Sequence, residues 1–242
     1  MSGKRKKLRT ALTVLIIIAA ALAAVFFVYV NIYYRADDRA LAALESDEAV
    51  EVEQTSYGWF FDGPGESAGL IFYPGAKVEE TAYAPLLHLA ASRGLDVCLV
   101  RMPWRLAVLN SGAAAGILRQ YDYENWYVGG HSLGGAMAAS YAAKHPEGLK
   151  GVILLGAYPV TRMPDSLLEI LVAGSEDGIV NRKRIEKGRK LAPARYEEHE
   201  IQGGNHAQFG SYGAQKGDGT AAITAEEQIE ETVDVICAAV LQ

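Results

Sequence analysis

The five residues Gly130-His131-Ser132-Leu133-Gly134 could do chemistry, because they match the pattern G-x-S-x-G. The apolar run 126–129 directly precedes them, and a stretch rich in small residues, 133–144, directly follows. In this strand–turn–helix context the pattern holds a nucleophilic serine in a strained turn that exposes its hydroxyl. The start of the following helix adds a partial positive charge where an oxyanion would develop. A glycine-rich turn with Ser132 as helix N-cap is the alternative interpretation.

Three features together carry a family resemblance. They are the stretch Ile71-Phe72-Tyr73-Pro74-Gly75-Ala76-Lys77, the turn around Ser132, and an Asp and a His late in the chain. With these features the sequence resembles the α/β-hydrolase superfamily, and within it the small, lidless dienelactone-hydrolase-like and esterase-like members. The resemblance covers residues of about 55 to 240. It implies the fold and the mechanism and leaves the substrate open.

A serine hydroxyl needs a base to take its proton, and the base needs an acid to hold its tautomer. The resemblance implies a base in the loop after the last strand, where His206 follows two glycines and an asparagine. It implies an acid just after a late strand, where Asp177 follows the apolar run 167–173, with Glu176 open as a substitute. The chain order Ser132, Asp177, His206 is the order expected of this fold.

Two backbone N–H groups are expected to form an oxyanion hole. One belongs to Leu133, the residue after the nucleophile. By the resemblance, the other belongs to Ala76, in the loop Tyr73-Pro74-Gly75-Ala76. Pro74 stands where the family frequently has His, which matters little because a backbone N–H is the donor. An ordinary Pro-Gly turn is the alternative for this loop.

Met102 and Trp104 follow another strand at its carboxyl end, where ligands of open α/β sheets bind. We expect them to line the substrate pocket, and packing in the core or at the rim is the alternative for each.

Short apolar runs alternate with helical segments along most of the chain, which predicts a doubly wound, mostly parallel α/β sheet covered on both faces. Residues 50–61 predict an opening strand or hairpin. Further strands are expected at 69–73, 96–101, 126–129, 151–155, 167–173 and 196–201, and helices at 81–93, 106–119, 133–144, 181–191 and 225–240, with a glycine-rich loop at 210–224. The interval between 155 and 167 is too short for a cap domain.

The N-terminus carries a targeting signal. Five basic residues within positions 4–9 precede an uncharged run from Thr10 to Val30. At 1.5 Å per residue this run spans about 30 Å, the thickness of the hydrocarbon core of a bilayer. We expect residues 1–35 to be a cytoplasmic tip and a single-pass anchor in the cell membrane, 36–49 a juxtamembrane stalk, and 50–242 an extracytoplasmic hydrolase domain. A cleaved signal peptide is the rival interpretation.

The charge of the chain and its two cysteines argue against nucleic-acid binding and against a metal site. The formal charge is −6, and the basic residues gather at the N-terminus, so the rest of the chain is more acidic and is not expected to bind nucleic acid. Cys98 and Cys237 are expected to be buried thiols rather than a disulfide. No Cys or His partner stands at a ligand-like spacing from them, so neither a metal nor another cofactor is expected.

The resulting hypothesis is a serine hydrolase that cleaves a small ester or related acyl bond through an acyl-enzyme on Ser132. Two alternatives stay open, namely a catalytically silent surface binding protein of the same fold, and an acyltransferase or amidase with the same triad. The sequence leaves the oligomeric state open.

Overall fold

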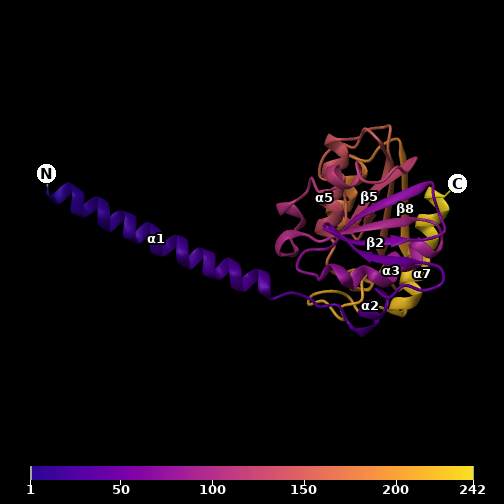
Figure 1. Ribbon diagram of the computed structural model, residues 1–242, viewed down its shortest axis with the longest axis horizontal. Coiled ribbons are helices and arrows are strands. Elements are labelled where there is room, and N and C mark those ends of the chain that lie inside the picture. The colour runs from indigo at the N-terminus through magenta and orange to yellow at the C-terminus, as the bar shows by residue number, and fades with distance from the viewer. Residues whose placement is uncertain (1, 242) are drawn as a thin grey trace. The chain divides into compact units, whose positions relative to one another are not determined.

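The computed structural model describes residues 2–241, and the chain divides into two compact units, Met1–Tyr33 and Tyr34–Gln242. The first unit is helix α1 (Ser2–Asn31), drawn in indigo in Figure 1. Its part Arg5–Asn31, 27 residues, is long and apolar enough to cross a membrane. A signal sequence near the N-terminus would meet the same criterion of length and composition.

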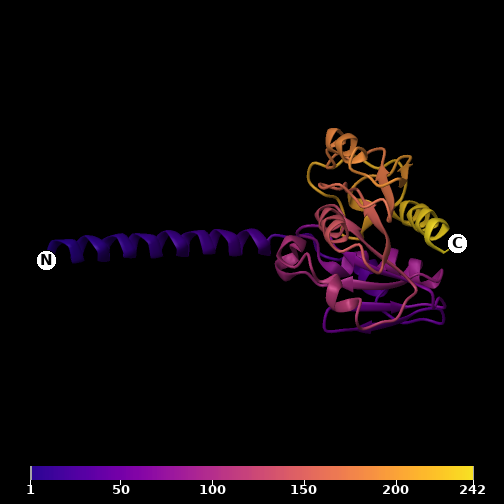
Figure 2. The same ribbon diagram turned by 90° about the horizontal axis from the view of Figure 1, so that it is seen from above.

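The second unit is built on one eight-stranded sheet with the order β1-β2-β4-β3-β5-β6-β7-β8. The strands from β4 to β8 pair in parallel, and β1 and β2 form an antiparallel hairpin at one edge. The strands are β1 Glu51–Gln54, β2 Gly58–Asp62, β3 Ala68–Tyr73, β4 Asp96–Val100, β5 Asn125–His131, β6 Leu149–Leu155, β7 Leu168–Gly174 and β8 Arg195–Ile201. The predicted mostly parallel α/β fold is therefore confirmed. Figure 2 shows the chain colour running across the body from magenta to orange, since β5 to β8 follow one another along the sheet.

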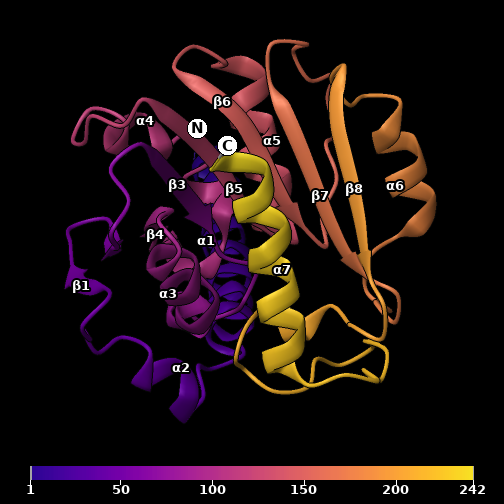
Figure 3. The same cartoon turned by 90° about the vertical axis from the view of Figure 1, so that its right-hand side faces the viewer.

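Helices cover both faces of the sheet. Helices α3 (Ala84–Ser92) and α7 (Ala225–Val240) lie together on one face, and α5 (Leu133–Lys144) lies on the other (Figure 3). Helix α6 (Arg182–Arg189) connects β7 to β8 and packs Ile185 against the end of β7. Only residues 156–167 separate β6 from β7, so no cap domain is inserted there.

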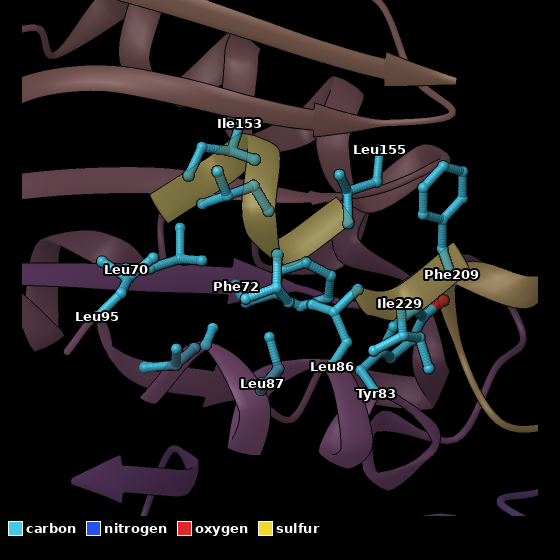
Figure 4. Packing of buried hydrophobic residues seen from close by; sticks show 14 of the residues in the cluster. Leu70, Phe72, Tyr83, Leu86, Leu87, Leu95, Ile153, Leu155, Phe209 and Ile229 are labelled. Atoms are coloured by element: carbon cyan, nitrogen blue, oxygen red, sulfur yellow. The ribbon is translucent and has the colours of Figure 1, made fainter. Parts of the chain in front are cut away.

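The two faces have separate apolar cores, because alternate residues of each strand point to opposite sides. On the α3/α7 face, Leu70 and Phe72 of β3 pack with side chains of α3 and with Phe209 and Ile229 (Figure 4). On the α5 face, Ile71 and Tyr73 pack in a second cluster. Strand β3 is therefore buried on both sides, which explains its unbroken apolar sequence.

The prediction of one helix over 106–119 is wrong. The structure has a 3-10 turn at Ala107–Leu109 and then the short helix α4 (Ala114–Ile117). Asn110, Ser111 and Gly112 favour turns over helix interiors. A tertiary contact then holds the break, because the Tyr73 hydroxyl accepts a hydrogen bond from Ala114 N–H (2.9 Å) and donates one to the Ser111 carbonyl (3.0 Å).

The segment expected to be a stalk contains helix α2 (Asp38–Ala42), which belongs to the second unit and packs against α3. Ala40 is buried there, and Asp37 N–H donates to the Ser211 carbonyl at 3.0 Å. The predicted loop 210–224 has no helix or strand. Cys98 and Cys237 are unpaired thiols, and burial raises the pKa of Cys98 to about 12.

Candidate active site

Ser132 lies in the turn between β5 and α5, in a strained backbone conformation. Its φ is 53° and its ψ is −123°, a region that residues other than glycine rarely adopt. The Ser132 N–H donates to the Leu155 carbonyl at 2.9 Å, which holds the turn against the end of β6. The surrounding sheet therefore maintains the strain that presents this side chain.

The two glycines that flank Ser132 are required by close backbone contacts. A Cβ at Gly130 would lie 2.3 Å from the Tyr73 carbonyl oxygen. A Cβ at Gly134 would lie 2.2 Å from the same oxygen and 2.4 Å from that of Pro74. Contacts this short are impossible, so any side chain at either position would push the turn away from the loop after β3.

His206 and Asp177 form a buried hydrogen-bonded pair. Nδ1 of His206 lies 2.7 Å from Oδ2 of Asp177, and both side chains are almost completely inaccessible to solvent. The other carboxylate oxygen, Oδ1, accepts from Ile179 N–H (2.9 Å) and Val180 N–H (2.7 Å). These bonds fix the orientation of the carboxylate, and the carboxylate in turn fixes that of the imidazole.

Glu176, the substitute left open by the sequence, is oriented differently. It is exposed, and its Oε1 accepts a hydrogen bond from the neighbouring Ser175 hydroxyl at 3.0 Å. The structure thus brings Asp177, not Glu176, to the imidazole of His206.

Gly156 is a site residue that the sequence analysis missed. It follows β6 with φ 52°, and a Cβ there would lie 2.8 Å from His206 Nδ1 and 3.2 Å from Asp177 Oδ2. A side chain at position 156 would therefore collide with the hydrogen-bonded pair of His206 and Asp177, so this position requires glycine. A glycine directly after an apolar strand was the available signal.

Ser132 and His206 border the same pocket, of about 290 Å³. Nε2 of His206 is buried and has no hydrogen-bond partner among the described residues. The remaining lining residues are Leu133, Ala136, Gly156, Ala157, Tyr158, Ile179, Val180, Asn181 and Arg184. A larger hollow of about 480 Å³, beyond the His206 loop, is bordered by neither Ser132 nor His206, so the smaller pocket is the candidate site.

Two polar side chains that the sequence analysis also missed hold the loops of the pair. Asp218 accepts from Gly178 N–H (3.0 Å) beside Asp177 and from Ala207 N–H (2.8 Å) beside His206. The fully buried Gln228 of α7 both accepts from and donates to the backbone of Asn205, at 2.9 and 2.8 Å. Neither belongs to a recognisable motif, so only the fold reveals their positions.

The N–H groups of Ala76 and Leu133 donate no hydrogen bond within the part of the chain that the structure describes. Ala76 lies in the loop after β3, and Leu133 lies at the start of α5. These two segments are close in space, because Gly134 approaches the backbone of Tyr73 and Pro74. Leu133 also lines the pocket of Ser132. Both groups are thus unoccupied donors, as an oxyanion hole requires.

A buried relay links the loop of Ala76 to the nucleophile turn. Gly75 N–H donates to the Tyr83 hydroxyl (3.0 Å), which lies 2.8 Å from Nδ1 of His131. Burial lowers the pKa of His131 well below its ordinary value, and the adjacent His206 lowers it further. Burial thus favours the neutral imidazole of His131, whose Nδ1 shares one hydrogen bond with the Tyr83 hydroxyl.

Met102 and Trp104 do not border the pocket of Ser132. Met102 is buried in the core on the α5 face, and Trp104 is about half exposed, with a φ of 53°. Both line a different hollow, next to Glu79 and Arg101. The pocket of Ser132 is lined instead by residues such as Tyr158, in the loop after β6, and Arg184, in α6.

Comparison with known proteins agrees with this architecture. A family model described as "Alpha/beta hydrolase family" matches residues 69–230. A search of curated proteins finds no match. Solved structures with the same fold include a dienelactone hydrolase from Anabaena variabilis (13% identity, TM-score 0.57, covering 79% of this chain and 99% of that one). The naproxen esterase of Bacillus subtilis is 11% identical, with a TM-score of 0.55, and the match covers 84% of this chain and 95% of that one. A bacterial membrane phospholipase A is 12% identical, with a TM-score of 0.58, and the match covers 96% of this chain and 98% of that one.

Proposed function

The chain belongs to the alpha/beta hydrolase family, and from this premise we propose that it is a serine hydrolase that cleaves a small ester or related acyl bond. In this proposal Ser132 is the nucleophile, His206 the general base and acid, and Asp177 the residue that orients His206. Hydrolases and esterases among the structures of the same fold support the general class of reaction.

One observation carries the proposal. A buried imidazole is held by a carboxylate through Nδ1, its Nε2 is without a partner among the described residues, and it borders the same pocket as Ser132. A buried polar atom without a partner is costly, so such an atom in a residue that shares a pocket with a strained serine is better explained by chemistry than by packing.

The proposed reaction follows from these positions. The Ser132 Oγ bonds to the acyl carbon while His206 Nε2 takes its proton, and Asp177 stabilises the imidazolium. Collapse of the tetrahedral intermediate breaks the bond to the leaving oxygen, which receives the proton from Nε2. Water then attacks the acyl-enzyme with the same help from His206, which releases the acid and restores Ser132.

The N–H groups of Ala76 and Leu133 are the proposed oxyanion donors. Charge develops on the carbonyl oxygen only as the intermediate forms, so these donors act mainly on the transition state. Loss of one such donor costs about 2.7 to 4 kcal/mol in other serine hydrolases. An acyltransferase or amidase would use the same groups, and a silent binding protein would have no use for the unpartnered Nε2.

The molecule is proposed to be anchored by residues 1–35 as a single span of the cell membrane, with residues 36–49 next to the membrane and the hydrolase domain, 50–242, on the extracytoplasmic side. The apolar helix α1 and its basic N-terminal flank support this arrangement.

A fluorophosphonate probe tests the proposed function. We expect the full-length protein in non-ionic detergent to be labelled covalently, and the Ser132→Ala variant not to be labelled. Ser140→Ala is the matched control, because Ser140 lies in α5, the helix that follows Ser132, but donates to the Ala136 carbonyl (2.9 Å) and is not among the residues that line the pocket. Unlabelled but folded wild-type protein would favour the binding-protein alternative.

A further inference from the structure

Arg184 is the one permanently charged residue that lines the pocket of Ser132, within the described chain. Apart from the imidazole of His206, the other lining residues are apolar or neutral. No carboxylate lines the pocket, so the positive charge is not balanced from within it.

The arginines of α6 differ in their partners. Arg182 bonds to Glu200 (3.1 Å) and to the Ser175 carbonyl (2.6 Å), and Arg189 makes two bonds to Glu198 (2.6 and 2.7 Å). Both therefore tie α6 to the end of the sheet. Arg184 makes one long contact, 3.5 Å, with the Tyr158 hydroxyl, and no ion pair with any described residue.

The backbone of Arg184 is nevertheless held firmly in place. Its N–H donates to the side chain of Asn181, the N-cap of α6, at 3.2 Å. Gly188 lets α6 lie close to the loop after β6, since a Cβ there would be 3.1 Å from Cβ of Tyr158. The helix thus closes one side of the pocket and places the exposed residue Arg184 at its wall, where most of its five donors have no partner among the described residues.

We propose that the substrate is an ester that carries a negatively charged group, a carboxylate or a phosphate, which Arg184 binds while Ser132 attacks the acyl carbon. This inference rests on the proposed function. The planar guanidinium matches the oxygens of either group with two parallel hydrogen bonds. The chain as a whole is acidic, at −6, so the attraction is local to this pocket and selects for anions that bind there.

Two matched pairs of esters test the proposal on the full-length protein in non-ionic detergent. In the first, 4-nitrophenyl valerate is compared with mono-4-nitrophenyl glutarate, which has a carboxylate in place of the terminal methyl group. In the second, a 1-monoacylglycerol is compared with the 1-acylglycerol 3-phosphate of the same acyl chain. The pairs distinguish a carboxylate on the acyl side from a phosphate on the alcohol side, and Ser132→Ala measures spontaneous hydrolysis.

We expect wild type to prefer the anionic member of one pair by about tenfold or more in kcat/KM, the usual size for a charge-assisted hydrogen bond. Arg184→Gln should reduce this preference to about twofold or less, because the anionic ester then loses its charge-assisted hydrogen bonds. Lys183→Gln, a change of equal charge at a residue of α6 that does not line the pocket, should keep the preference.

Equal use of neutral and anionic esters by a wild-type protein that the fluorophosphonate probe labels would overturn this inference alone. So would a preference that survives in Arg184→Gln. Absence of both labelling and turnover of all four esters would overturn the proposed function as well, so the two failures are distinguishable.

Discussion

At the scale of single residues, the site depends on side chains that are held in one orientation by hydrogen bonds and close contacts with their neighbours. Asp177 shows this most clearly, because Oδ1 is taken by two backbone N–H groups and Oδ2 alone is left for His206. The nucleophile turn is similar, since Ser132 is strained and its flanking glycines touch backbone. Substitutions here should therefore change catalysis through orientation and tautomer.

Asp177→Asn should lower kcat by on the order of 10³- to 10⁴-fold. The amide oxygen would keep the two N–H bonds of Oδ1, so the NH₂ group would face Nδ1 of His206. That donor forces the imidazole proton onto Nε2, which then cannot accept the proton of Ser132. Turnover of an activated ester measures the loss.

Glu176→Gln is the matched control for that change, one residue away. Because the side chain of Glu176 is exposed and accepts a hydrogen bond from Ser175 rather than from His206, kcat should stay within about twofold of wild type. Equal losses in the two variants would remove Asp177 from its proposed role.

Tyr83→Phe should lower kcat by about tenfold or more with little change in KM. The substitution leaves Gly75 N–H without its acceptor and His131 Nδ1 without its hydrogen-bond partner, so the loop of Ala76 loses its link to the nucleophile turn. Steady-state kinetics and urea unfolding separate the effect on catalysis from that on stability.

Tyr73→Phe provides the comparison, because the Tyr73 hydroxyl also joins two backbone groups in a buried site, Ala114 N–H and the Ser111 carbonyl. Both variants should lose about 1 to 3 kcal/mol of stability, but only Tyr83→Phe should lose kcat. A similar fall in kcat for both would mean that the Tyr83 relay acts through stability alone.

At the scale of the elements, the residues of the site lie together at the carboxyl ends of the parallel strands. Ser132, Gly156, Asp177 and His206 follow β5, β6, β7 and β8 in turn.

Strand β7 also contains a buried carboxyl group that is unrelated to the site. Both carboxylate oxygens of Glu169 are buried without a hydrogen-bond partner among the described residues. Burial, with a smaller effect of Glu198, raises the pKa of Glu169 to about 8.

This carboxyl should make stability fall as pH rises. Between the ordinary pKa of about 4.5 and about 8, the unfolded chain has released the proton that the folded chain still holds. The free energy of unfolding should therefore decrease from pH 5 to pH 8, by up to about 1.4 kcal/mol per pH unit. Urea midpoints across this range measure the decrease.

Glu169→Gln should flatten that pH dependence, since the amide does not titrate. Glu186→Gln, at an exposed position of α6, should leave it as in wild type. An unchanged pH profile in Glu169→Gln would assign the decrease to other groups.

At the scale of the whole molecule, we propose that the two units lie in different surroundings. Helix α1 is surrounded by lipid, and the hydrolase unit is surrounded by water. If α1 is an uncleaved anchor, the protein should stay in the membrane pellet after carbonate extraction, and its intact mass should include the N-terminal residues. A shorter mature protein in the supernatant would instead indicate a cleaved signal sequence.

The sequence by itself determined the alternation of apolar runs and helices, the nucleophile turn and the apolar N-terminal helix, because each depends on neighbouring residues along the chain. It also led to Asp177 and His206, through the places that the family resemblance implies. The helix expected at 106–119 failed because a tertiary contact from Tyr73 competes with local propensity.

Only the tertiary structure decided which groups meet across the sheet. Gly156, Asp218 and Gln228 lie far along the chain from the residues they support, and none belongs to a motif. The same holds for the pocket wall, because Arg184 lines the pocket of Ser132 while Met102 and Trp104 do not. Contacts of this kind depend on how strands and loops pack in space, a property that no local pattern of residues encodes.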